Sequence, residues 1–115
     1  MEGGNTWYRL ARKAQRWAKL NPESWHLMAR YTREMSMHAR PFSINIVLSR
    51  VRWDCALMGK RLRMDNTLAP YIARKLRKEY PLCRDYLMLQ EYYYDKQCLE
   101  NGTGIYEVFQ PINIQ

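Results

Sequence analysis

Residues 42–80 read FSINIVLSRVRWDCALMGKRLRMDNTLAPYIARKLRKEY, and this stretch decides the fold of the chain. It begins with Ser43, whose hydroxyl can accept from the free amides of a first helical turn. Gly59 adopts positive φ easily and so favours the end of a helix. Between them apolar residues recur every three or four positions, which predicts a helix over 43–58. Its inward face is formed by Ile44, Val47, Leu48, Val51, Cys55 and Met58.

Residues 61–64 alternate basic and apolar side chains, the period of a half-buried strand. Strand amides need a partner, so we expect a short antiparallel β-ribbon. Residues 86–90 are the first choice for the second strand, and 105–109 are the alternative.

A second helix follows that strand, over residues 67–80. Asp65, Asn66 and Thr67 supply a turn and an N-cap, Pro70 fits the first turn, and Pro81 ends the helix. The inward stripe is predicted to contain Leu68, Tyr71, Ile72 and Leu76, with Arg74, Lys75, Arg77 and Lys78 on the outer side.

The N-terminal part predicts two more helices, over 6–20 and 22–38. Asn5 or Thr6 caps the first, and Pro22 fits the start of the second. The first has an apolar stripe of Trp7, Leu10, Ala11, Ala14, Trp17 and Ala18. Its other face carries Arg9, Arg12, Lys13, Arg16 and Lys19 without an acid among them. Like charges four residues apart repel by a few tenths of a kcal/mol, roughly, so a binding partner would explain this face. A simple solvated face is the plainer alternative.

These elements make one domain over residues 1–115, of the α+β class but mainly helical. We expect a small four-helix domain with a helix-turn-helix or winged-helix-like core. The chain has 19 Lys and Arg against 11 Asp and Glu, a net charge of +8. Residues 1–80 hold seventeen of these cations and six acids, a balance of +11. Such a surface attracts polyanions.

Little in the sequence points to catalysis or to a bound cofactor. Cys55, Cys83 and Cys98 are odd in number and widely spaced, which favours free thiols in a reducing cytoplasm. His26 and His38 are twelve residues apart and lack neighbouring ligands, so we expect no metal. No catalytic motif is present, and no apolar run is long enough to cross a membrane. We therefore expect a cytoplasmic protein that is not an enzyme.

The chain resembles, in part, a family of small, basic, uncharacterised proteins of bacteriophages and mobile elements. The resemblance covers residues 42–90. It is carried by Phe42-Ser43, Arg52-Trp53-Asp54, Arg63-Met64-Asp65-Asn66, Ala69-Pro70-Tyr71, Ala73-Arg74 and Tyr80-Pro81. The family more often has Glu where this chain has Asp54. The resemblance implies an origin in a phage or mobile element, and therefore a bacterial host cell, but no mechanism.

The charge pattern predicts a nucleic-acid-binding module, with DNA a better candidate than RNA. The candidate contact residues are Arg9, Arg12, Lys13, Arg16, Arg50, Arg52, Trp53, Lys60, Arg61, Arg63, Arg74, Lys75, Arg77 and Lys78. For Trp53, packing against the first helix is the structural alternative. The alternative function is a phage inhibitor of a host defence complex, similar in role to anti-CRISPR proteins. Its basic face would then meet a nucleic-acid-handling protein complex.

Overall fold

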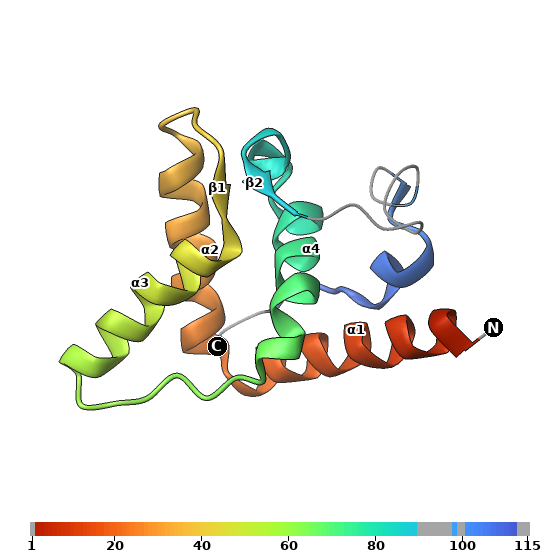
Figure 1. The fold of residues 1–115 in the computed structure, drawn as a ribbon, viewed down its shortest axis with the longest axis horizontal. Helices are drawn as coiled ribbons and strands as arrows, with labels where there is room; N and C mark the ends of the chain where they lie inside the picture. The colour runs from red at the N-terminus through yellow and green to blue at the C-terminus, as the bar shows by residue number, and fades with distance from the viewer. Residues whose placement is uncertain (1, 90–97, 99–100, 113–115) are drawn as a thin grey trace.

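The structure of the protein is a computed structural model that describes residues 2–89, 98 and 101–112. The described residues form four α-helices, short 3-10 helices (η) and one small sheet, so the fold is mainly helical (Figure 1). In chain order the elements are α1 (Glu2–Leu20), α2 (Pro22–Ser36), β1 (Phe42–Ser43), α3 (Ile44–Leu57), η1 (Asn66–Leu68), α4 (Ala69–Glu79), η2 (Pro81–Asp85), β2 (Leu87–Met88) and η3 (Gly104–Val108).

Helix α4 is the centre of the fold. In Figure 1 it runs through the middle of the molecule, with α1 beside its first turns and with α2 and α3 on one side. The η3 segment packs against both α1 and α4. Because neighbours cover α4 on several sides, every residue from 71 to 76 is buried.

The predicted helices all exist, and their ends differ by a few residues. The start of α1 at Glu2 makes the predicted caps at Asn5 and Thr6 wrong. Helix α2 ends two residues before the predicted His38, and the chain then turns through Ala39, which has a φ of 54°. The predicted boundaries of α3 are confirmed within one residue, with an extended Ser43 before it and Gly59 at a φ of 69° after it.

The predicted antiparallel ribbon is wrong. The strands of the described residues are parallel, and they pair Phe42 with Leu87 and Ser43 with Met88. Residues 61–64 are not a strand, and Leu87 and Met88 of the expected partner strand pair with β1 instead. The indole Nε1–H of Trp17 donates to the carbonyl of Arg63 at 2.7 Å. The described residues thus contain no ribbon that could serve as the wing of a winged helix. Gln90, the end of one predicted strand, lies outside them.

The alternative strand over 105–109 is also wrong, because residues 104–108 form the 3-10 helix η3. Gly102 and Gly104 both have positive φ, near 67° and 63°, and they turn the chain into this helix. One side chain contacts the backbone here: the ammonium group of Lys78 donates to the carbonyls of Tyr106 in η3 and of Phe109 directly after it.

The apolar stripes form the core largely as predicted. Ala11, Ala14 and Ala18 of α1 are fully buried, and their small size lets this helix approach its neighbours closely. The exception on α3 is Met58, which is 57% exposed because it lies at the helix end, beyond the packed turns.

Candidate polyanion-binding surface

The exposed face of α1 carries a row of cations. Arg9, Arg12, Lys13 and Arg16 are all exposed, as the helical spacing predicts. Within the described residues, none of the three guanidinium groups forms an ion pair with a carboxylate. Lys13 lies 3.7 Å from Asp65, in a pair whose side chains are both about half exposed. Such surface pairs contribute little, so this row keeps most of its positive field.

A groove joins this row to the segment between α3 and α4. Figure 1 shows that segment running past the C-terminal end of α1. The groove measures about 460 Å³; Lys13 and Arg16 line one side, Arg63 lines the other, and Trp17 and Leu68 contribute apolar surface. The 2.7 Å bond from Trp17 to the Arg63 carbonyl fixes the segment against α1. We call Arg9, Arg12, Lys13, Arg16 and Arg63 the basic strip.

Asp65 is the acidic residue that lines this groove, and its carboxylate is hydrogen-bonded within the protein. The backbone N–H of Thr67 donates to its carboxylate at 2.9 Å, which caps η1. This hydrogen bond, with a smaller effect from Lys13, lowers the pKa of Asp65. The carboxylate therefore stays ionised, but its charge is already shared with the backbone.

The neighbouring cations of the segment are exposed but differ in their contacts. Lys60 lies 3.6 Å from Glu23 at the start of α2. Arg61 is exposed, and within the described residues no carboxylate pairs with it. These two residues lie beside the basic strip in sequence, outside the lining of the groove.

The predicted contact residues of α3 are also exposed but differ in their contacts. Arg50 lies 3.5 Å from Glu34 and stacks on the ring of Tyr31, with its guanidinium carbon 4.1 Å from the ring centre. Arg52 donates to the side chain of Asn66 at 3.3 Å. Trp53 is 66% exposed, so the alternative that it packs against the first helix is wrong.

The expectation that the cations of α4 point outward is wrong. Arg74 and Lys75 are both fully buried. Arg74 donates to the carbonyl of Pro70 at 2.8 Å, and its guanidinium lies 5.8 Å from the ring centre of Trp7. The sequence pattern failed here because η3 and α1 cover the side of α4 that was expected to face solvent.

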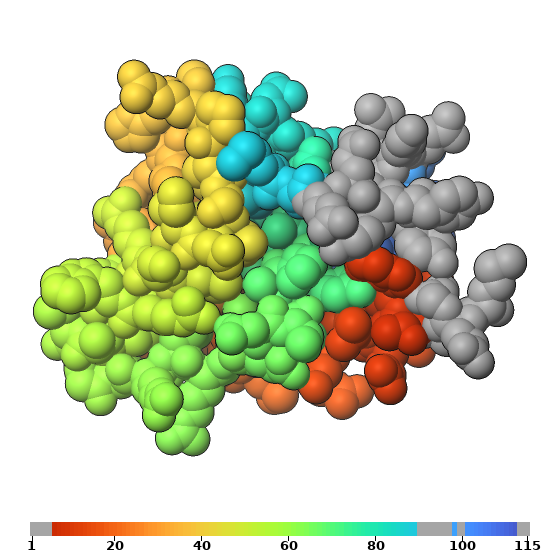
Figure 2. All heavy atoms as spheres, viewed as in Figure 1, coloured from red at the N-terminus to blue at the C-terminus, as the bar shows by residue number. Residues whose placement is uncertain are grey.

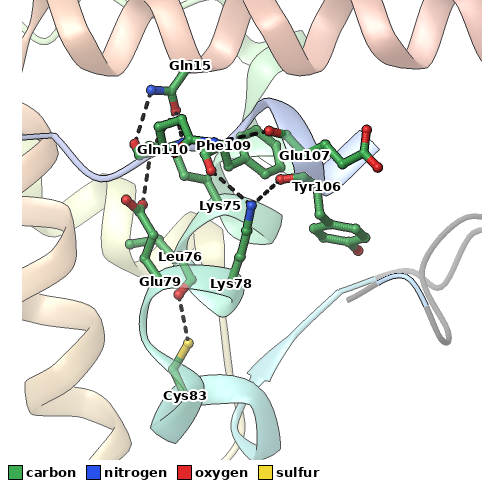
Figure 3. A network of polar contacts seen from close by, with 10 residues as sticks. All are labelled: Gln15, Lys75, Leu76, Lys78, Glu79, Cys83, Tyr106, Glu107, Phe109 and Gln110. Carbon is green, nitrogen blue, oxygen red and sulfur yellow. Dashed lines mark hydrogen bonds and ion pairs between the residues drawn. The ribbon is translucent and has the colours of Figure 1, made fainter. Parts of the chain in front are cut away.

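Lys75 is the hub of a buried polar network (Figure 3). Its ammonium group donates to the side-chain oxygen of Gln15 at 2.6 Å and to the backbone carbonyl of Gln110 at 2.7 Å. It also lies 3.0 Å from a carboxylate oxygen of Glu79 and 4.7 Å from the ring centre of Trp25. A buried cation needs partners of this kind, because an unpaired one is costly.

Burial shifts the pKa values of this pair in opposite directions. It lowers the pKa of Lys75, which the nearby Glu79 partly opposes, and it raises the pKa of Glu79, which Lys75 partly opposes. Both shifts disfavour the charged forms, as burial does. The network is a structural element of the core and offers no charge to a partner.

Lys78 and Arg77 are also engaged by the protein itself. Figure 3 shows Lys78 reaching the carbonyls of Tyr106 and Phe109 in the segment that covers α4. Arg77 donates to the carbonyl of Arg84 at 3.3 Å, and the guanidinium of Arg84 donates back to the carbonyl of Arg77 at 2.7 Å. Both cations stabilise turns.

Sequence reasoning missed the partners of these buried cations. Gln15 lies between the buried Ala14 and Ala18. A polar residue at the edge of an alanine stripe was therefore the one sequence feature that could have indicated a buried polar partner. The backbone carbonyls of Tyr106, Phe109 and Gln110 gave no signal, because any residue type supplies one.

The described residues contain no group of three or more His, Cys, Asp or Glu arranged to hold a metal ion. Cys55, Cys83 and Cys98 are free thiols, the first two of them buried. Among the helices of the described residues, none combines the length and apolar character needed to cross a membrane.

Comparisons with protein-family models, curated proteins and solved structures found no match to this chain.

Proposed function

We propose that the protein binds duplex DNA through the basic strip, as a protein of phage or mobile-element type. The observation that carries this function is the groove in which Lys13 and Arg16 of α1 meet Arg63 of a distant segment. Cations from two parts of the chain thus contribute to one surface. Arg9 and Arg12 extend it along the exposed side of the same helix.

The contacts favour phosphate binding over recognition of bases. Arginine donors match phosphate oxygens in a two-pronged geometry, and four of the five residues in the strip are arginines. The bond between Trp17 and the Arg63 carbonyl holds the two sides of the groove in place before a ligand arrives. Affinity then comes chiefly from counterion release, which depends little on sequence and strongly on salt.

The contacts of α3 give less support to the expectation of a helix-turn-helix, in which α3 would enter the major groove. The cation of Arg50 is paired with Glu34, and the side chain of Arg52 is bonded to Asn66. Base contacts from α3 would need at least one of these interactions to break. The proposed DNA contact therefore lies on α1 and the segment beside it.

The test is fluorescence anisotropy with a labelled DNA duplex over a series of NaCl concentrations. If all five cations neutralise phosphates, the slope of log affinity against log salt is about −4 to −5. The double variant Arg12→Glu, Arg16→Glu should bind about tenfold or more weakly and reduce that slope by about two.

The matched control is Arg30→Glu, Arg33→Glu, which changes the net charge equally on a different helix. Arg30 is paired with Glu34 at 3.2 Å, and Arg33 lies over the ring of Tyr80. A much smaller loss of affinity is expected. Equal losses of affinity in the two double variants would mean that net charge alone drives binding. If the wild-type protein does not bind the duplex at physiological salt, DNA is ruled out as its ligand.

One observation favours the alternative, an inhibitor of a nucleic-acid-handling complex. The groove has an apolar floor, and Leu20 at its end is 72% exposed. Apolar surface of this kind suits a side chain of a protein partner better than a phosphate. Two results together would support this alternative. The protein would not bind DNA, and its inhibition of such a complex would require Arg12 and Arg16.

A further inference from the structure

Helix α3 has apolar residues on two opposite faces. Val47, Leu48 and Val51 are buried against the core. On the outside, Ile46 is 50% exposed, Trp53 66% and Leu57 70%. Figure 1 shows α3 at the edge of the molecule, and in the space-filling view its residues form part of the left edge (Figure 2). A packed core explains the first face but not the second.

The outer residues follow the spacing of a helix-pairing seam. Ile46, Arg50, Trp53 and Leu57 are separated by four, three and four positions, which is the alternation of the two seam positions in a heptad. Ser49 and Ala56 flank this seam and are exposed and small, so another helix can approach closely. We call Ile46, Ser49, Arg50, Trp53, Ala56 and Leu57 the α3 seam.

The seam is complementary to itself in the antiparallel direction. The midpoint between Ile46 and Leu57 falls between residues 51 and 52, and the midpoint between Arg50 and Trp53 falls at the same place. A two-fold axis there sets Ile46 against Leu57 of a second copy, two aliphatic side chains. The same axis sets Arg50 against Trp53 of that copy, a favourable cation and aromatic pair.

The charge of the seam also fits a second copy. Its cation, Arg50, lies 3.5 Å from Glu34 of its own protomer, a carboxylate that also pairs with Arg30, and it is held over the ring of Tyr31. Two seams can therefore meet without bringing unpaired cations together. The basic strip of α1 is the opposite case, since copies of it would repel each other. For a polyanion, the α3 seam offers little beyond one paired cation.

We propose that α3 is a dimerisation helix that packs antiparallel against α3 of a second copy, about a two-fold axis between Val51 and Arg52. At 14 residues, α3 is about 21 Å long, room for two heptads. An interface of this length lies at the small end for stable complexes. The dimer is accordingly weak and reversible, and it forms as the protein concentration rises.

Sedimentation velocity of the full chain over a concentration series tests the dimer. Wild-type protein should shift from monomer to dimer, and Trp53→Glu should raise the dimer dissociation constant about tenfold or more, because it removes a central aromatic contact. Met37→Glu is the matched control, since Met37 is 78% exposed and lies outside α3. It should dimerise like the wild type, and circular dichroism verifies that both variants fold.

Cysteine cross-linking tests the antiparallel direction. In a Cys98→Ser background, mixing Ile46→Cys protein with Leu57→Cys protein should give a disulfide-linked dimer, and either variant alone should give much less. A wild type that stays monomeric, a dimer that Trp53→Glu does not weaken, or stronger linking of Ile46→Cys with itself would each overturn the proposal. All these readouts are independent of DNA binding.

Discussion

Helices α1 and α4 carry similar runs of Arg and Lys, and the fold uses them in opposite ways. On α1, Arg9, Arg12 and Arg16 are exposed. On α4, Arg74 and Lys75 are fully buried, and Lys75 is bonded to Gln15 of α1 itself. One helix leaves its cations exposed to solvent, whereas the other uses them to hold the core and the segment 104–110 together.

The difference shows that a basic helical face in a sequence does not identify a binding surface. Coverage by other elements decides the outcome. The solvent face of α1 is left open, but η3 and α1 pack on α4. The backbone carbonyls of Gln110 and Phe109 accept hydrogen bonds from Lys75 and Lys78 of α4. Three predictions sharpen this contrast, and the first has the largest effect.

Replacing Lys75 by Met should lower the free energy of unfolding by about 3–5 kcal/mol, because Glu79 and the carbonyl of Gln110 lose a buried partner. The matched change on α1, Arg12→Met, should stay within about 0.5 kcal/mol, as exposed positions do. Urea denaturation followed by circular dichroism measures both. Similar values for the two variants would mean that the cations of α1 and α4 are equivalent after all.

Alkaline pH should destabilise the contact between η2 and α4. The thiol of Cys83 lies 3.7 Å from the carbonyl of Leu76, and burial raises its pKa from 9.0 to about 11, against the opposing effect of Arg77 and Arg84. The folded pKa is raised, so the stability contributed by this thiol is complete below pH 9 and is lost as the pH rises to about 11.

Stability curves of wild type and Cys83→Ala measure this contribution. Between pH 9 and 11 the wild type should lose at most about 2–3 kcal/mol more than the variant, which has no thiol to ionise. Burial also lowers the pKa of Lys75, whose titration affects both proteins alike, so the difference isolates Cys83. Parallel curves would show that the thiol is accessible in the folded protein.

The smallest effect concerns repulsion on α1. Arg12 has Tyr8 and Arg16 as neighbours at four residues, and its guanidinium lies 5.9 Å from the ring centre of Tyr8. Arg12→Gln should raise the free energy of unfolding by about 0.2–0.5 kcal/mol at low salt, because a like-charge pair is removed. The gain should disappear at high salt, which screens exposed charges. A loss of stability would mean that the contact with Tyr8 outweighs the repulsion.

Much of the helical fold could be predicted, because its signals are local. The spacing of Val47, Val51 and Cys55, with Ser43 before them and Gly59 after them, fixed α3 within one residue. The sheet could not be predicted. Its strands have two residues each, and they pair segments more than forty positions apart in a parallel direction that no turn prescribes.

The candidate site was predictable only in part. The open face of α1 follows from its helical period alone. The meeting of Arg16 with Arg63 does not, because it depends on the bond from Trp17 to a backbone carbonyl. The pairing of Arg50 with Glu34 likewise depends on how α2 packs against α3.

By itself, the sequence determined where helices form and how much positive charge the chain carries, since both depend on residue type and on neighbours a few positions away. Tertiary structure alone decided which cations remain available. Burial depends on what packs over a side chain, and for Lys75 the covering groups come from Gln15 and Gln110, which are 95 positions apart in the sequence.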